Sequence, residues 1–432
     1  MAIELDITGA PLALSIDDEP SGFRVESALS TFAMSSSFRI RMVADHADPS
    51  LGPAAFVGRR VRVGFPADIG KPAARGVIRS FRHLGVEAGS ARYEIDIASP
   101  LCLLALRTDS RFFKDQCVSD SVRQLLAAYG GDAPELRVLD ESALTVHECR
   151  LQHDETDHDA LFRLLAADGV ASFFDLYAEG ALTLIPDTRR LGRHAAVRVA
   201  FAPPGAVDAP LHRVREVEVD GSIASLGVRI HASEEAATSA VVARAKVGLD
   251  SVYERCRFEP GAPSEALLDR RADAALWAEY GASLTITLRG TAFVPPGSAL
   301  RLSPAPHTEA AGEVLVIESR SGWWAPRSGL AAASSHELVC IPLQHRFVPQ
   351  GLPKKRIPGL HRATVVGDGE LDTRGRVLCR FGWDRDGSGT RRVPVGPGCG
   401  SAGGARARLG SEVLVSYLDG DPDWPVIVGG LG

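Results

Sequence analysis

The chain has 432 residues, which at about 150 residues per domain predicts two or three domains. Apolar residues make up 45% and charged residues 24%, the balance of a soluble globular protein and not of a disordered one. The first ten residues, MAIELDITGA, lack the positive region of a signal peptide, and no apolar run approaches the roughly 18 residues of a membrane span. We therefore expect a cytoplasmic protein without an integral membrane segment.

Cysteine spacing and charge exclude further classes. The seven cysteines form no Cys-x-x-Cys pair, so we expect small buried side chains and neither disulfides nor a zinc knuckle. The net charge of −6 is uneven, because residues 351–432 carry twelve basic and nine acidic side chains. A nucleic-acid interpretation would depend on Arg391, Arg392, Arg406 and Arg408. Single-strand binders add exposed aromatic platforms, which this region lacks, so we expect no nucleic-acid partner.

Alternation of apolar and polar residues predicts strands with one dry and one wet face, as in antiparallel sheets or barrels. The clearest runs are 38–42, 60–65, 92–97, 216–219 and 284–288. The sequence therefore predicts a mainly β protein.

Three helices interrupt the strands. One is predicted over Ser119–Ala128, with Ser119 as its cap. A second covers Thr156–Ala167, where Thr156 and Asp159 have the spacing of a capping box. The third covers Ser264–Tyr280 and ends before a glycine.

A proline-rich, lysine-containing stretch at 349–359 predicts an extended linker. The strands expected after it, at 363–366, 376–381 and 412–418, fit a small OB-type barrel over 360–432. Before it, the segment AFVG at 55–58 and the segment AFV at 292–294 each lead into a strand. Three matched residues are chance-level alone, and the echo carries weight only if residues 1–348 hold two similar β-barrels together with helices.

The turn Gly420-Asp421-Pro422-Asp423, followed by Trp424-Pro425, predicts a rigid corner. Proline presets φ, and the two carboxylates can accept bonds from nearby backbone amides. The corner would place the final strand. An ordinary tight hairpin turn predicts the same local geometry.

The sequence contains one histidine-rich run that could suggest a metal site, and none of the common catalytic motifs. His153 and His158 are five residues apart, not the four that place two ligands on one helical face, so we expect helix-capping acids there and no metal. The chain has no GxSxG, no HExxH and no Walker loop. We expect no cofactor and no enzymatic activity.

From the linker onward the sequence resembles the VgrG spike proteins of bacterial type VI secretion, which are related to the hub and spike of contractile phage tails. The resemblance rests on PGLHRATVVG at 358–367, DTRGRVLCRFGWDRD at 372–386 and LGSEVLVSYLDGDPDWPVIVG at 409–429. Residues 111–126 and 152–174 look like the two hub helices of the family. The motif positions carried over are Gly375, Arg376, Val377, Trp383, Asp384, Gly410, Glu412, Val413, Gly420, Asp421, Pro422 and Asp423.

The resemblance implies a phage-hub-like region over 1–348, made of two similar β-barrels and helices. A linker at 349–359 and an OB-type barrel at the base of the spike over 360–432 would follow it. It implies a homotrimer on a hexameric Hcp-type tube, with baseplate proteins and a PAAR-type tip or effectors as further partners. Such a component acts mechanically, resides in the cytoplasm before firing and is then exported by the contractile apparatus. This chain ends at Gly432, before the β-helix needle usual in the family, so we expect hub contacts alone to hold a concentration-dependent trimer. The alternatives are a phage or prophage tail hub and, from another class, a peptidoglycan-acting tail enzyme.

Overall fold

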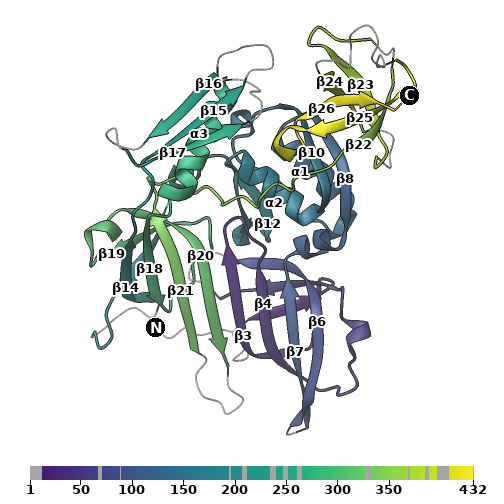
Figure 1. Ribbon diagram of the computed structural model, residues 1–432. Coiled ribbons are helices and arrows are strands. Elements are labelled where there is room, and N and C mark those ends of the chain that lie inside the picture. Colours follow the sequence, from purple (N-terminus) through teal and green to yellow (C-terminus); the bar gives the residue numbers. More distant parts are fainter. Residues whose placement is uncertain are drawn as a thin grey trace.

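The computed structural model describes residues 12–66, 71–87, 89–193, 196–206, 212–233, 240–246, 252–259, 265–325, 333–367, 370–384, 389–396 and 408–431. Strands dominate these residues, and the α-helices among them are α1 (Val118–Ala127), α2 (Asp157–Ala167) and α3 (Glu265–Tyr280). The mainly β class predicted from the alternating pattern is confirmed (Figure 1).

Six strands form a closed barrel. Their order is β19 (Ala299–Ser303), β13 (Val197–Phe201), β14 (Arg213–Gly221), β18 (Leu284–Gly290), β21 (Ala333–Pro342) and β20 (Glu313–Trp324). The ring closes because β19 pairs with β13 on one side and with β20 on the other. Inward-facing side chains such as Ile286, Leu288 and Leu300 fill its core.

A second, curled sheet continues from the same strand. The first half of β20 pairs with β19, whereas its second half, Glu318–Trp324, pairs with β3 (Arg24–Ala33). From β3 the sheet runs through β4 (Arg39–His46), β7 (Ser90–Ala98), β6 (Ala73–Glu87), β5 (Arg60–Gly64), β1 (Ala13–Ile16) and β2 (Glu19–Pro20).

The expectation of two similar barrels is therefore corrected to one closed barrel and one curled half-barrel. The physical reason is that a strand has two edges, and β3 uses one for β4 and the other for β20. Neither edge of β3 is left to close the second ring within the described residues. Phe293, which follows β18 of the closed barrel, packs into the core of the curled sheet, where its ring stacks on that of Phe65 with centroids 5.2 Å apart.

A helical layer covers one end of the curled sheet (Figure 1). It contains the antiparallel pair β8 (Thr108–Gln116) and β10 (His147–Thr156), α1, α2 and a three-stranded sheet of β9 (Leu136–Val138), β12 (Ala181–Ile185) and β11 (Ala171–Asp175). Thr156 caps α2 as predicted, since its side chain accepts a bond from the amide of Asp159. The cap predicted for α1 is wrong: Cys117 is the N-cap, and Ser119 is buried within the first turn.

Between β14 and β18 the chain leaves the closed barrel to form a separate unit. It consists of β16 (Ala240–Lys246), β15 (Gly227–Ser233) and β17 (Glu254–Glu259), in that order, with α3 packed on one face. The described part of α3 begins at Glu265 and agrees with the predicted helix, whose first residue, Ser264, lies outside the described residues.

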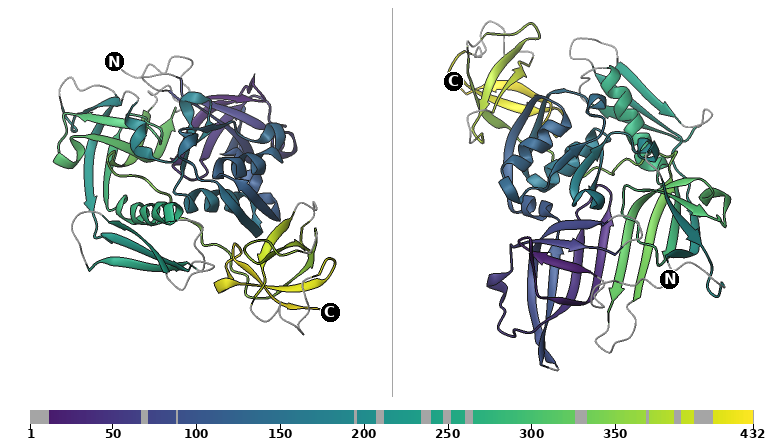
Figure 2. Two further views of the ribbon diagram at one scale, coloured as in Figure 1. Left: turned by 90° about the horizontal axis from the view of Figure 1, so that it is seen from above. Right: turned by 180° about the vertical axis from the view of Figure 1, so that it is seen from behind.

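The C-terminal residues form a small barrel, which Figure 2 shows standing apart from the closed barrel and the curled half-barrel. Its strands are β22 (His361–Val365), β23 (Arg376–Phe381), β24 (Thr390–Pro394), β25 (Glu412–Tyr417) and β26 (Pro425–Gly430). Their order is β24-β23-β22-β25-β26, and a parallel bridge from Val395 to Ile427 closes the ring.

Candidate functional site

The Gly-Asp-Pro-Asp turn lies where the small barrel meets the helical layer. It connects β25 to β26, and the Asp423 carboxylate accepts a bond of 2.8 Å from the backbone amide of Leu151 in β10. Arg391 of β24 donates to the backbone carbonyl of Asp423. Asp421 shapes the corner from within, because its carboxylate accepts from the Asp423 amide at 2.9 Å. The turn thus joins the two parts of the chain and does more than reverse it.

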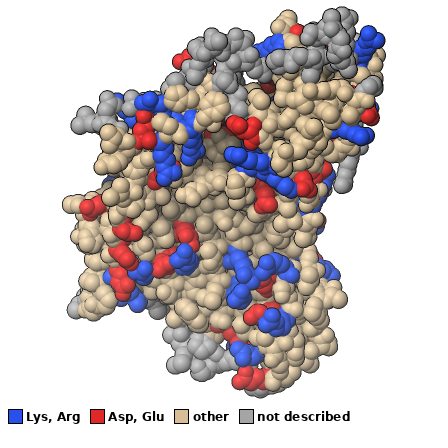
Figure 3. Space-filling view, viewed as in Figure 1, with Lys and Arg blue, Asp and Glu red and all other residues tan. Residues whose placement is uncertain are grey.

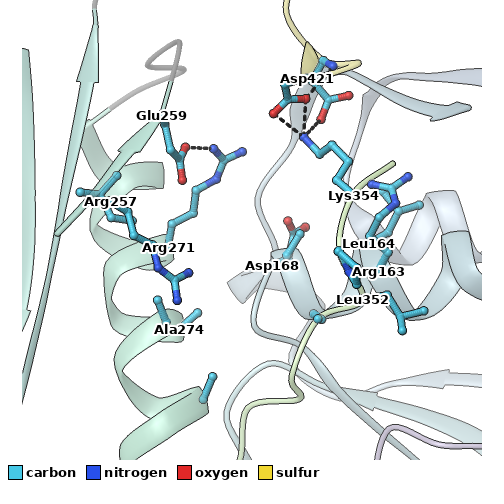
Figure 4. Close-up of a pocket in the computed structure, with 18 of the residues that line it drawn as sticks. Arg163, Leu164, Asp168, Arg257, Glu259, Arg271, Ala274, Leu352, Lys354 and Asp421 are labelled. Atoms are coloured by element: carbon cyan, nitrogen blue, oxygen red, sulfur yellow. Dashed lines mark hydrogen bonds and ion pairs between the residues drawn. The ribbon is translucent and has the colours of Figure 1, made fainter. Parts of the chain in front are cut away.

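Lys354 holds both carboxylates of the turn (Figure 4). Its Nζ lies 2.7 Å from an oxygen of Asp421 and 2.7 Å from an oxygen of Asp423. The Asp423 side chain is 15% exposed and that of Lys354 is 31% exposed. Burial alone would raise the pKa of Asp423, but the Lys354 ammonium, aided by Arg391 and Arg163, lowers it well below its usual range. Burial opposes the charge on Lys354 as well, and the two carboxylates overcome it and raise the pKa of Lys354.

The segment predicted as a linker is extended but docked at both of its lysines. Lys355 donates to the backbone carbonyl of Asp154 at 2.8 Å and pairs with the carboxylate of the same residue. Ile357 is buried in the small-barrel core, and its amide donates to the carbonyl of Gly420 at 2.8 Å. Gly420 has φ of +72°, and a Cβ there would lie 3.3 Å from the Ile357 carbonyl, so this position requires glycine.

On the helical-layer side of the junction, a buried ion pair fixes the backbone. Arg163 of α2 binds the Glu155 carboxylate and donates to the Leu151 carbonyl at 3.0 Å. Leu151 is therefore held through both of its backbone groups: its carbonyl accepts from Arg163, and its amide donates to Asp423. Since Arg163 is 5% exposed in its side chain, this backbone is fixed where the small barrel docks.

Aromatic and histidine side chains form a seam beside the turn. Phe112 of β8 shares one core with the small barrel and lies 5.6 Å from Phe381 and 5.1 Å from Trp383, centroid to centroid. His153 of β10 lies 5.2 Å from His361 of β22. Tyr417 lies 2.8 Å from Nδ1 of His361 through its hydroxyl, and the Trp383 indole donates to the same nitrogen at 3.3 Å.

The other motif residues shape the small barrel itself. Gly375 (φ +68°) and Gly410 (φ +80°) occupy turns that precede strands. Val377 and Val413 are buried in the core, whereas the side chain of Glu412 is exposed. Asp384 accepts a hydrogen bond from the amide of Gly389. Arg385 and Asp386, which complete this motif in the sequence, lie outside the described residues.

Arg376 is a further motif residue that contacts the helical layer. It pairs with Asp372 at 2.9 Å within the small barrel and with Glu148 of β10. Four of the motif residues thus come together at the junction: Asp421, Asp423, Trp383 and Arg376. Sequence reasoning missed their partners Lys354, Leu151 and Glu148, and the lysine pair within the proline-rich segment was the one available signal.

A groove of about 840 Å³ opens beside the junction, between α2, α3, the extended segment and the turn. Figure 3 shows Lys and Arg side chains on two sides of this hollow, over the α3 unit and below the small barrel. Its lining includes Arg257, Arg271, Asp168 and Lys354, which Figure 4 places around the opening.

The histidine run is not gathered into a metal centre. Nε2 of His158 lies 3.2 Å from the Ser37 hydroxyl, whereas His153 faces His361. Among the described residues, no three His, Cys, Asp or Glu side chains are placed to hold one ion. Asp157, expected only to offset the helix dipole, is fully buried and binds Arg111 and Tyr129. A nucleic-acid interpretation would depend on four arginines. Of these, Arg391 donates to the Asp423 carbonyl at the junction, and Arg406 lies outside the described residues.

A profile of the phage tail baseplate hub family (GPD) matches residues 31–322, and the chain belongs to this family. It is 27% identical over 376 residues to the type VI secretion system spike protein VgrG1b of Pseudomonas aeruginosa, covering 78% of this chain and 49% of that protein. It is 26% identical over 390 residues to the actin cross-linking toxin VgrG1 of Vibrio cholerae, covering 82% of this chain and 34% of that protein.

The resemblance to VgrG-type spike proteins is thereby confirmed, and the chain is a structural component of the hub and spike type. It spans about half or less of the length of these relatives. Its fold is similar to that of the E. coli c3393 protein, a type VI secretion component described as similar to the phage T4 tail proteins gp27 and gp5. The TM-score is 0.71 at 17% identity, over 96% of this chain and 99% of that one.

A second structure with a similar fold is a chain of the Francisella PdpA-VgrG complex, with a TM-score of 0.58 at 9% identity over 95% of this chain and 68% of that one. None of the described helices combines the length and the apolar character that crossing a membrane requires.

Proposed function

We propose that this chain is the hub and barrel portion of a homotrimeric spike that docks on a hexameric Hcp-type tube. The observation that carries the proposal is the single sheet in which the closed barrel and the curled half-barrel lie side by side, joined through β20 and β3. Three chains would present six such β-structures in a ring, so a threefold assembly could match a sixfold tube.

The small barrel is proposed to be of the OB type and to form the base of the spike. In chain order its strands follow the ring 1-2-3-5-4, with the third and fifth strands joined in parallel. On this proposal residues 1–348 form the hub region, 349–359 connect it, and 360–432 form the barrel. A load on the barrel would pass to the hub through Lys354, Arg376 and the aromatic seam.

The role is mechanical. The spike would centre the baseplate in the cytoplasm, support a PAAR-type tip or an effector, and leave the cell when the sheath contracts. A phage or prophage tail hub has the same architecture and differs in its tube. A peptidoglycan-acting tail enzyme is the alternative from another class, and it predicts release of muropeptides from purified cell wall by this chain.

Co-sedimentation with preformed rings of an Hcp-type protein tests the proposal. We expect three chains per six ring subunits and no muropeptide release. Binding to a phage tube protein but not to Hcp-type rings would support the tail-hub alternative. Failure to bind any sixfold ring would contradict the proposal.

A further inference from the structure

The groove beside the junction borders the free edge of a strand. Arg257 and Phe258 are neighbours in β17, so their side chains leave opposite faces of the sheet, yet both line the groove. Side chains from both faces can line one cavity only where the strand presents its edge or end to it. β17 pairs with β15 alone, so its outer edge carries no strand partner in the described parts of the chain. An edge strand offers backbone donors and acceptors to an added strand.

The opposite wall is also extended backbone. Residues 349–355 contain no helix or strand, and Gln350, Gly351, Leu352 and Pro353 are exposed where they line the groove. The floor between the walls is made of small side chains, which let a third chain approach closely. They are Ala166 and Ala167 of α2 and Ala274, Ala275 and Ala278 of α3.

Along the β17 wall of the groove, positive charge exceeds negative charge. Glu279 pairs with Arg255 at 2.8 Å and lies 3.8 Å from Arg257, so one carboxylate serves two arginines. Arg257 is 52% exposed in its side chain. Arg356, on the opposite wall, has no ion pair among the described residues.

Most carboxylates of the groove are already neutralised by this chain. Glu259 is held by Arg271, and Asp168 by Arg150 and His147. Both turn carboxylates are held by Lys354. Asp419, at the rim, is the exception.

We propose that this groove receives an extended acidic peptide segment of a partner protein, added as a strand along β17. Arg255 and Arg257 are two residues apart, so both face the α3 side of the sheet, as do their register partners Val228 and Ile230 in β15. A peptide with acidic residues at i and i+2 would present both to this face in the same register. Main-chain bonds to β17 would supply affinity, and the arginines would select acidic side chains. The proposal does not depend on the trimer, because every part of the groove belongs to one chain.

The test uses a short, labelled, acetylated and amidated peptide in which two glutamates alternate with valine and threonine. We expect saturable binding by fluorescence anisotropy, together with slower hydrogen exchange of the amides of residues 254–259. The variant Arg257→Ser with Arg356→Ser should weaken binding about tenfold, as expected for two screened ion pairs. The control Arg82→Ser changes an exposed arginine of β6 and should leave binding unchanged.

Two control peptides separate strand addition from simple charge attraction. One carries lysine in place of glutamate, and the other carries N-methylated backbone amides that cannot donate. Equal binding of the N-methylated peptide would overturn strand addition, and equal binding of the lysine peptide would overturn acidic selection. The β17 amides that bond to β15 are protected without peptide, so the informative amides are those on the outer edge of β17. Protection of these outer amides in the trimer before any peptide is added would show that a second copy fills the groove, which also overturns the proposal. A measured trimer mass without peptide binding would leave the proposed spike function standing and this inference refuted.

Discussion

Replacing Lys354 with methionine should loosen the small barrel from the helical layer. The change removes an ammonium that makes contacts of 2.7 Å to each of Asp421 and Asp423, and it leaves both carboxylates partly buried without their cation. Breaking a fully buried pair costs about 3–5 kcal/mol, and an exposed pair at most about 1 kcal/mol. With Lys354 31% and Asp423 15% exposed, we expect a loss of about 2–3 kcal/mol in the free energy of docking.

Hydrogen exchange at the Leu151 amide reports this docking directly, because that amide donates to Asp423. It should exchange faster by about 30- to 150-fold in Lys354→Met, the factor that corresponds to about 2–3 kcal/mol. Adding Asp421→Asn and Asp423→Asn should restore much of the protection, since asparagine removes the stranded charge and keeps an acceptor. Lys71→Met, at an exposed lysine, is the matched control. Unchanged exchange in Lys354→Met would refute the reasoning.

Three further predictions concern the small barrel and the histidines. Phe381→Ala should cost about 3–5 kcal/mol because the ring is 2% exposed in the core, and a melting temperature within a degree of wild type would contradict that placement. Burial lowers the pKa of His361, and burial and His361 lower that of His153. The docked state therefore binds fewer protons, so docking is complete above the ordinary histidine pKa of about 6.5 and weakens as pH falls below it. Hydrogen exchange at the seam between pH 5 and 8, corrected for the intrinsic pH dependence of amide exchange, measures this. The remaining pH dependence should weaken in His361→Gln, vanish when His153→Gln is added, and stay unchanged in His83→Gln. Purified protein should hold no stoichiometric zinc or iron, and a bound metal lost in the double variant His153→Ala, His158→Ala would count against this.

Local features of the fold were predictable because their causes are local. The alternation at 92–97 places Tyr93, Ile95 and Ile97 on one face, and all three are fully buried in β7. Thr156 caps α2 because its hydroxyl reaches an amide three residues on. The first helix was misplaced because Cys117, a residue with a weak acceptor, takes the cap with the help of Asp120.

Features set by distant pairing could not be predicted. The closed barrel and the half-barrel differ because β20 divides one edge between β19 and β3, and no local pattern encodes that division. The Gly-Asp-Pro-Asp corner was predicted as rigid, but its cation is 67 residues away from Asp421 in the sequence. Lys354 was visible as a charge in a proline-rich segment, and nothing local indicated its acceptors.

The native mass of the chain across a dilution series tests the central claim most directly. At high concentration we expect three times the 45.9 kDa chain mass, with partial dissociation on dilution. Fusing a family β-helix after Gly429, the next-to-last residue of β26, which pairs with Leu414, should make the trimer persist when dilute. A strict monomer at high concentration that stays monomeric after the fusion would contradict the account of this chain as part of a trimeric spike.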